Sequence, residues 1–305
     1  MNITRFAANL ALAGGVILLP SSPAWADYQA GSAALHSGDT ATALREFSAE
    51  AAKGDMRAQN DLGVMYEKGL GVPRDYAKAM SWYRKAAAKG FAPAETSIGY
   101  FYAEGLGVPR DYAQAMSWFR KAAEQNFAQA QNNIGAMYEN GRGVPQDPAQ
   151  AADWYRKAAD QGHASGQTNL GFLYARGKGV ARDDAMAVEL YRKAAARNFP
   201  LALNNLGFMT AQGRGVAQDD AAAAALYRKA ADLKFPLAQF NLAKAYEHGK
   251  GVPQDDAQAM LWLKRAADNG YKPAMRYLAQ VYTRGLLGQR ISPDTARQWS
   301  DKAAH

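Results

Sequence analysis

The chain has 305 residues, no cysteine and a formal net charge of +8. The lack of cysteine excludes thiol catalysis, disulfide bonds, cysteine-ligated zinc and a lipid-bearing cysteine. A basic chain favours acidic partners in general, but its net charge does not specify one.

Residues 1–26 resemble a secretory signal peptide. Arg5 supplies the positive start, residues 6–19 are apolar, and residues 24–26 (Ala-Trp-Ala) form a cleavage site. The apolar run is shorter than the roughly 20 residues that span a bilayer. We therefore expect cleavage after Ala26, a periplasmic or secreted protein, and no membrane span after cleavage. The alternative is an uncleaved, membrane-tethered chain.

Residues 27–54 predict a short helical hairpin that caps the amino-terminal end of the fold. Its helices are expected at residues 28–36 and Thr40–Ala52, joined by a Ser-Gly-Asp turn. The hairpin lacks the long loop of the units that follow. Terminal units of a repeat array must cover an apolar face that would otherwise be exposed.

Residues 55–305 carry one pattern that returns every 36 residues, which predicts a repeat array. In the first unit, the apolar periodicity predicts helices Met56–Lys68 and Tyr76–Ala87. Gly69 ends the first helix in a left-handed conformation, and Asp75 caps the second. Six such units and a divergent seventh, which closes with helix Pro293–Ala304, predict an all-α solenoid of helix pairs.

Three columns of the pattern predict how the helices pack. Gly63 and Ala79 recur as small residues, which let two helices approach closely. Val72 recurs and is expected to fill the core under the loop. Trp82 recurs as Trp118, and we expect this column to fill wider gaps; Trp118→Ala would cost roughly 3–5 kcal/mol if the ring were fully buried.

The pattern resembles that of the Sel-1-like repeat family, which is related to the tetratricopeptide repeats. The third unit matches it at Ala130, Asn133, Ile134, Gly135, Tyr138, Gly141, Gly143, Val144, Asp147, Ala151, Trp154, Tyr155, Ala158 and Ala159. The resemblance covers about residues 55–305. It implies a right-handed superhelix of antiparallel helix pairs with a concave face. It also implies a role in assembling or regulating other proteins, commonly in bacterial envelopes, without a shared catalytic residue.

No catalytic, cofactor-binding or metal-binding residues are predicted. His36, His163, His248 and His305 are spread along the chain, and no two have the i, i+4 spacing of a helical metal site. The Gly-x-Gly of each loop lacks the strand and third glycine of a dinucleotide fingerprint. We therefore expect a non-enzymatic scaffold; the alternative is a secreted enzyme acting on peptidoglycan or a β-lactam.

A protein or peptide partner is expected on the first helix of the units. Asparagines form one column there, and the residues three and seven positions further on share their side of the helix. Amides can bind an extended backbone and aromatic rings can anchor its side chains. The alternative is that the asparagines brace the neighbouring unit. The candidate residues are Asn133, Asn169, Phe172, Arg176, Asn205, Phe208 and Asn241.

The second helices carry a basic ladder. It consists of Arg84-Lys85, Arg120-Lys121, Arg156-Lys157, Arg192-Lys193, Arg228-Lys229 and Lys264-Arg265. One interpretation is a solvated face whose aliphatic stems cover apolar surface. The other is a stripe that binds an acidic protein or an anionic envelope polymer. The export signal argues against nucleic acid as a partner.

Overall fold

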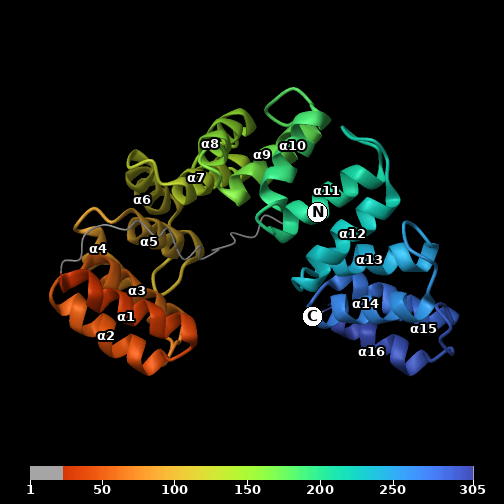
Figure 1. Cartoon of the computed structure of the whole chain (residues 1–305), viewed down its shortest axis with the longest axis horizontal. Helices are drawn as coiled ribbons and strands as arrows, with labels where there is room; N and C mark the ends of the chain where they lie inside the picture. Colours follow the sequence, from red (N-terminus) through yellow and green to blue (C-terminus); the bar gives the residue numbers. More distant parts are fainter. Residues whose placement is uncertain (1–22, 305) are drawn as a thin grey trace. The chain divides into compact units, whose positions relative to one another are not determined.

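The computed structural model describes residues 23–304, so most of the predicted signal peptide lies outside the described residues. The described residues form helices and no strand (Figure 1). In chain order the helices are α1 (Pro23–Ser37), α2 (Thr40–Ala52), α3 (Met56–Lys68), α4 (Tyr76–Ala87), α5 (Ala92–Glu104), α6 (Tyr112–Glu124), α7 (Ala128–Asn140), α8 (Pro148–Asp160), α9 (Ala164–Arg176), α10 (Asp184–Ala195), α11 (Pro200–Ala211), α12 (Asp220–Asp232), α13 (Pro236–His248), α14 (Asp256–Asp268), α15 (Lys272–Arg284) and α16 (Pro293–Ala304).

The chain forms two compact units, residues 1–158 and residues 159–305. Within the first unit each helix from α1 to α6 packs against the next one along the chain. The same holds from α9 to α16 within the second unit. Short turns between packed helices make neighbours antiparallel. The predicted all-α solenoid of helix pairs is therefore confirmed.

Most predicted helix boundaries are confirmed. Helices α2, α3, α4 and α16 begin and end at the predicted residues. The expected bounds of α1, residues 28–36, are wrong at the start, because the helix begins at Pro23. Proline lacks a backbone N–H and suits the first turn of a helix, where that group has no partner.

The loop of each unit stops one helix and starts the next as predicted. Gly69, after α3, has a φ of 71°, in the left-handed region. The Asp75 side chain accepts a hydrogen bond from the backbone N of Lys78 at 2.9 Å. The equivalent residues Asp111, Asp147, Asp183, Asp219 and Asp255 cap their own helices in the same way.

The recurring glycine of each first helix lies against a buried aromatic ring of the second helix. A Cβ atom on Gly63 would come within 2.5 Å of the Tyr83 ring, and one on Gly99 within 2.6 Å of the Phe119 ring. Both rings are fully buried. The same contact joins Gly135 to Tyr155, Gly171 to Tyr191 and Gly207 to Tyr227. The predicted close approach is confirmed, and its partner is this ring.

The prediction for the tryptophan column needs a correction. Trp82, Trp118 and Trp154 are half-buried, whereas Trp262 is 4% exposed. The ring that fills the interior belongs to the next residue along the helix, such as Phe119. The full burial that our estimate for Trp118→Ala assumed is therefore absent. Val72 is likewise half-buried.

Helix α9 has an unusual amino-terminal cap. The equivalent position in several other units holds an aromatic residue, such as Phe91 or Phe127, whose side chain makes no capping hydrogen bond. In α9 this position holds His163. Its Nδ1 atom accepts a hydrogen bond from the backbone N of Gly166 at 3.1 Å. Burial, together with the positive charge of Arg197, lowers the pKa of His163 from 6.5 to about 4. The cap therefore requires the neutral imidazole.

The contact of glycine with the ring generates a first prediction. Gly99→Ala should destabilise the protein by about 1–2 kcal/mol, because overpacking against Phe119 outweighs the gain in helix propensity. The unit with Ala243 in the glycine column has Leu263 in the ring column, and both lie in one hydrophobic cluster. Phe119→Leu should therefore cost less in the Gly99→Ala background than alone. Urea unfolding of the unchanged chain, the two single variants and the double variant measures this coupling. Strictly additive losses of unfolding free energy would contradict it.

We also expect acid to destabilise the protein through His163. Because its folded pKa lies below 6.5, the unfolded chain binds the proton more tightly. The neutral His163 side chain therefore contributes fully to stability above pH 6.5, and this contribution is lost as the pH falls from 6.5 towards 4. His163→Asn retains a capping side chain that does not titrate. Between pH 7 and pH 4, the unfolding free energy should fall by on the order of 3 kcal/mol more in the unchanged chain than in this variant.

Urea unfolding at pH 7, 5.5 and 4 tests the difference between the two chains. Titration of the His163 ring by NMR gives its pKa directly. Parallel losses of stability in both chains, or a pKa near 6.5, would show that the cap does not depend on the neutral ring.

Candidate functional site

The first helices of successive repeats in the second unit share one face. These helices are α9, α11, α13 and α15, and α11 lies against both α9 and α13. Spacings of three and four residues place Asn169, Phe172 and Arg176 on one side of α9. Asn205 and Phe208 hold the same positions on α11, and Asn241 holds the first of them on α13. We call this surface the first-helix face.

Two aromatic side chains are exposed on the first-helix face. Phe172 is 37% exposed and Phe208 is 46% exposed. The guanidinium carbon of Arg176 lies 5.4 Å from the centre of the Phe172 ring, which is within range of a cation–π contact. An exposed aromatic pair with an arginine beside it has the composition of residues that dominate protein interfaces.

Amide side chains connect α13 to α11 across the face. Asn241 donates from Nδ2 to Oδ1 of Asn204 at 2.8 Å, and Asn204 donates to Oδ1 of Asn205 at 3.4 Å. Asn205 also forms a side-chain hydrogen bond with Tyr191, whose pKa is raised chiefly by burial. Asn169 is half-buried on α9. The contacts of Asn241 and Asn205 agree with the alternative in which the asparagines brace the neighbouring unit. Binding of a partner by these amides stays a prediction.

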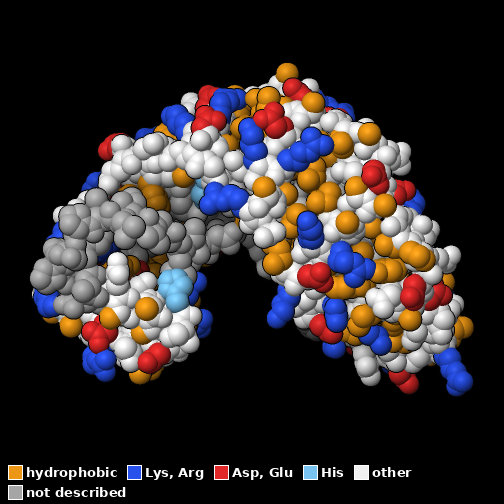
Figure 2. Space-filling model, viewed as in Figure 1, with side chains coloured by type: hydrophobic (Ala, Val, Ile, Leu, Met, Phe, Trp, Pro, Cys, Tyr) orange, Lys and Arg blue, Asp and Glu red, His pale blue; other side chains and the backbone are white. Residues whose placement is uncertain are grey.

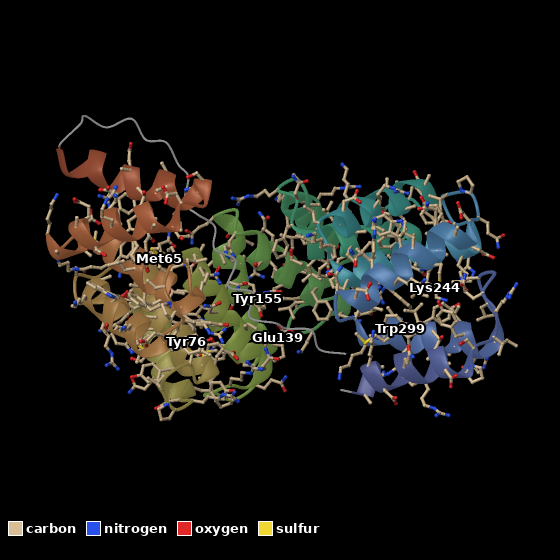
Figure 3. All side chains as sticks on the ribbon, turned by 90° about the horizontal axis from the view of Figure 1, so that it is seen from below. Met65, Tyr76, Glu139, Tyr155, Lys244 and Trp299 are labelled. Carbon is tan, nitrogen blue, oxygen red and sulfur yellow. The ribbon has the colours of Figure 1, made fainter. Side chains whose placement is uncertain are left out.

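Asn133 belongs to α7 in the first unit and is described apart from the other candidates. It is 5% exposed, and its Oδ1 accepts a hydrogen bond from Nε2 of Gln129 at 3.0 Å. Six residues beyond Asn133 on the same helix, Glu139 accepts a hydrogen bond from the hydroxyl of Tyr155 at 2.8 Å, and these two side chains adjoin in Figure 3. Asn133 therefore lies in a buried polar setting that offers little surface to a partner.

The structure adds a cluster on α13 and α15 that sequence reasoning missed. The Nζ atom of Lys244 lies 3.6 Å from the centre of the Tyr277 ring and 2.8 Å from a carboxylate oxygen of Glu247 (Figure 3). The Tyr277 hydroxyl donates to the same carboxylate. The available signal was that Lys244 and Tyr277 stand where the preceding repeat carries Phe208 and Asn241.

Ionisation within this cluster follows from its contacts. Burial alone would lower the pKa of Lys244, but Glu247 and Tyr277 outweigh it and raise the pKa. Burial alone would raise the pKa of Glu247, but the bonds from Lys244 and Tyr277 outweigh it and lower the pKa. Both groups therefore stay charged near neutral pH, and their charges largely cancel.

The basic ladder makes contacts within the protein. Lysines lie over the half-buried tryptophan three residues earlier, at 3.7 Å for Lys85 over Trp82 and 3.8 Å for Lys157 over Trp154. The Arg84 guanidinium donates to the Tyr102 hydroxyl of the next repeat at 3.3 Å. These contacts agree with the interpretation of stems that cover apolar surface. Binding of an acidic partner by the ladder stays a prediction.

Two further searches cover the residues that the structure describes. Within residues 23–304, no group of three or more histidine, cysteine, aspartate or glutamate side chains could hold a metal ion. Over the same residues, no helix is both long enough and apolar enough to cross a membrane.

Comparison with known proteins agrees with the repeat pattern. A structure of a Sel1 repeat protein from Oxalobacter formigenes is 35% identical, with a TM-score of 0.72, over 80% of this chain and 96% of that one. A protective antigen of uropathogenic Escherichia coli with an SLR fold is 37% identical, with a TM-score of 0.61, over 86% of this chain and 64% of that one. Yeast Tom70, at 16% identity and a TM-score of 0.54, shares the fold alone. A search of curated proteins found no match.

The match to a family model extends over most of the chain. The Sel1 repeat model matches seven consecutive segments, residues 57–91, 92–127, 128–163, 164–199, 200–235, 236–271 and 272–305. The last segment is the seventh unit, which diverges from the pattern after Tyr282. The chain therefore belongs to the Sel1 repeat family.

Proposed function

We propose that this protein is a non-enzymatic scaffold or regulator of the bacterial envelope that binds a protein partner on its first-helix face. Sel1 and tetratricopeptide-like solenoids are typically protein-interaction scaffolds. The proposal adds the place of binding and the compartment to that general role.

The exposure of Phe172 and Phe208 carries the proposal. Large aromatic side chains in adjacent repeats gain free energy when a partner removes them from water. Arg176 stacks on Phe172 and presents further guanidinium donors to a partner. In the equivalent column of the first unit, Val64 and Ala136 are each 7% exposed. The aromatic surface is thus a property of particular repeats and is not required by the repeat pattern.

The assignment to the envelope is supported by residues 1–26. Their positive start, apolar run and small-residue cleavage site have the organisation of an export signal. Expression of the full precursor in a Gram-negative host should give a mature periplasmic chain that begins at Asp27. Mass spectrometry of the intact protein measures this. An uncleaved chain in the membrane fraction would favour the tethered alternative, and a full-length chain in the cytoplasm would contradict export.

Combined substitution of Phe172→Ala and Arg176→Glu tests the binding face. Cross-linking in intact cells followed by quantitative mass spectrometry should recover the partner at least ~10-fold less with this variant, because an aromatic anchor and its arginine carry a large share of binding energy. Both side chains are exposed, so the thermal unfolding midpoint should stay close to that of the unchanged chain.

A matched variant on the other side of the unit serves as the control. Arg192→Glu with Leu233→Ala makes the same kind of change at exposed residues of α10 and at the end of α12. Arg192 belongs to the basic ladder. Loss of the partner with this control, and not with the Phe172 variant, would contradict the proposed face and place binding on the ladder.

A further inference from the structure

We propose that the first-helix face binds a polyproline II segment with apolar side chains at positions i and i+3 and an acidic side chain at i+6. This inference rests on the function proposed above and adds the conformation and chemistry of the bound segment. The three contacts are assigned to Phe172 on α9, Phe208 on α11, and Lys244 with His248 on α13.

The spacing of the repeats favours this conformation. Phe172, Phe208 and Lys244 hold the same position in three successive repeats, and α11 packs against both α9 and α13. Axes of packed helices lie about 8–10 Å apart. A polyproline II helix has three residues per turn and so repeats on one side every ~9 Å. A β-strand presents residues of one side every ~7 Å, which is shorter than the spacing of packed helices.

The chemistry of the face favours an open backbone over a helix. A polyproline II segment has no internal hydrogen bonds, so its carbonyl groups can accept from side chains. Gln212 is exposed one turn beyond Phe208 and can donate to such a carbonyl. A helix has its backbone satisfied and needs a broad apolar stripe, whereas the position after the two phenylalanines is occupied by Lys244.

Charge selects an acidic segment. The four helices α9, α11, α13 and α15 contain a single acidic residue, Glu247, which is bound by Lys244 and Tyr277. Exposed cationic side chains and histidines on the same helices are Arg176, His248, Lys272, Arg276 and Arg284. On the side seen in Figure 2, lysine and arginine side chains stand among hydrophobic and acidic ones over the second unit. A segment with an acidic residue beyond its apolar pair therefore complements this surface.

The first unit offers a contrast. Each of its equivalent helices α3, α5 and α7 carries at least one acidic residue, and the position of Phe172 and Phe208 is held on α5 by Tyr100, which is half-buried. The same acidic segment would meet Glu104 there, at the position that Arg176 holds in the second unit. Binding should therefore be confined to the second unit.

Synthetic peptides test the register directly on the purified mature chain. The probe is a fluorescein-labelled, amidated peptide of sequence Leu-Pro-Pro-Leu-Pro-Pro-Glu between glycines. The spacing control, Leu-Pro-Leu-Pro-Pro-Pro-Glu, has the same composition with the leucines two residues apart. Fluorescence anisotropy should show the probe binding at least ~10-fold more tightly than this control. Replacing its glutamate by glutamine should weaken binding several-fold, and added salt should do the same.

Variants assign the contacts. Phe208→Ala should weaken binding of the probe ~10-fold or more, whereas the matched substitution Tyr100→Ala in the first unit should leave it unchanged. Lys244→Gln should weaken binding of the glutamate probe and leave that of the glutamine probe nearly unaltered. Circular dichroism and thermal unfolding verify that each variant is folded.

The outcomes separate this inference from the proposed function. Equal affinity for the probe and the spacing control, or equal loss with Tyr100→Ala, overturns the polyproline II register. If neither peptide binds but Phe172→Ala with Arg176→Glu still removes the cellular partner, the register is wrong and the binding face stands. If the cellular partner is also retained, the proposed function fails as well.

Discussion

The structure depends on the contact between a glycine of the first helix and an aromatic ring of the second. The Gly99 backbone lies so close to the Phe119 ring that even a Cβ atom would overlap it. This contact brings the two helices of a hairpin together and fills their interior with a single ring. Because the ring occupies the interior, the tryptophan one residue earlier is displaced to the side. There the half-buried Trp118 is covered by Lys121 at 4.7 Å from the ring centre.

Neighbouring hairpins are joined by long cationic side chains. Arg214, in the loop after α11, donates to the carboxylate of Asp184 at 2.6 Å and to the backbone O of Ala175 at 2.8 Å. Hydrogen bonds from Arg214 and Arg182 hold the pKa of Asp184 well below its usual range. Much of the positive charge is thus used between repeats. Arg284 holds the position of Arg176 on the first-helix face, is exposed, and has no such role in the described structure, so it is available to a partner.

The sequence predicts helix boundaries well and side-chain partners poorly, for a physical reason. Boundaries depend on local signals, such as the left-handed Gly69 and the capping Asp75. Periodicity shows that Trp82 and Tyr83 both recur, but residues one apart point about 100° from each other on a helix. Which of the two faces the glycine depends on the rotation of the helix against its neighbour. The same limit applies to Asn241 and Asn204, whose hydrogen bond depends on the register between two helices.

Some residues that depart from the repeat pattern find a partner side chain within the fold, and others do not. Lys244 and Tyr277 break two columns in successive repeats, and each supplies the other's partner through a cation–π contact and the shared Glu247. The fold accounts for the presence of this pair, and the exposed part of Lys244 can still contact an acidic side chain of a partner. Phe208 stands in a column where Ala136 is buried, yet it is 46% exposed. The exposed part of this ring gains no burial within the described structure. Binding of a partner on the first-helix face, as proposed above, would give a physical reason for a phenylalanine at this position.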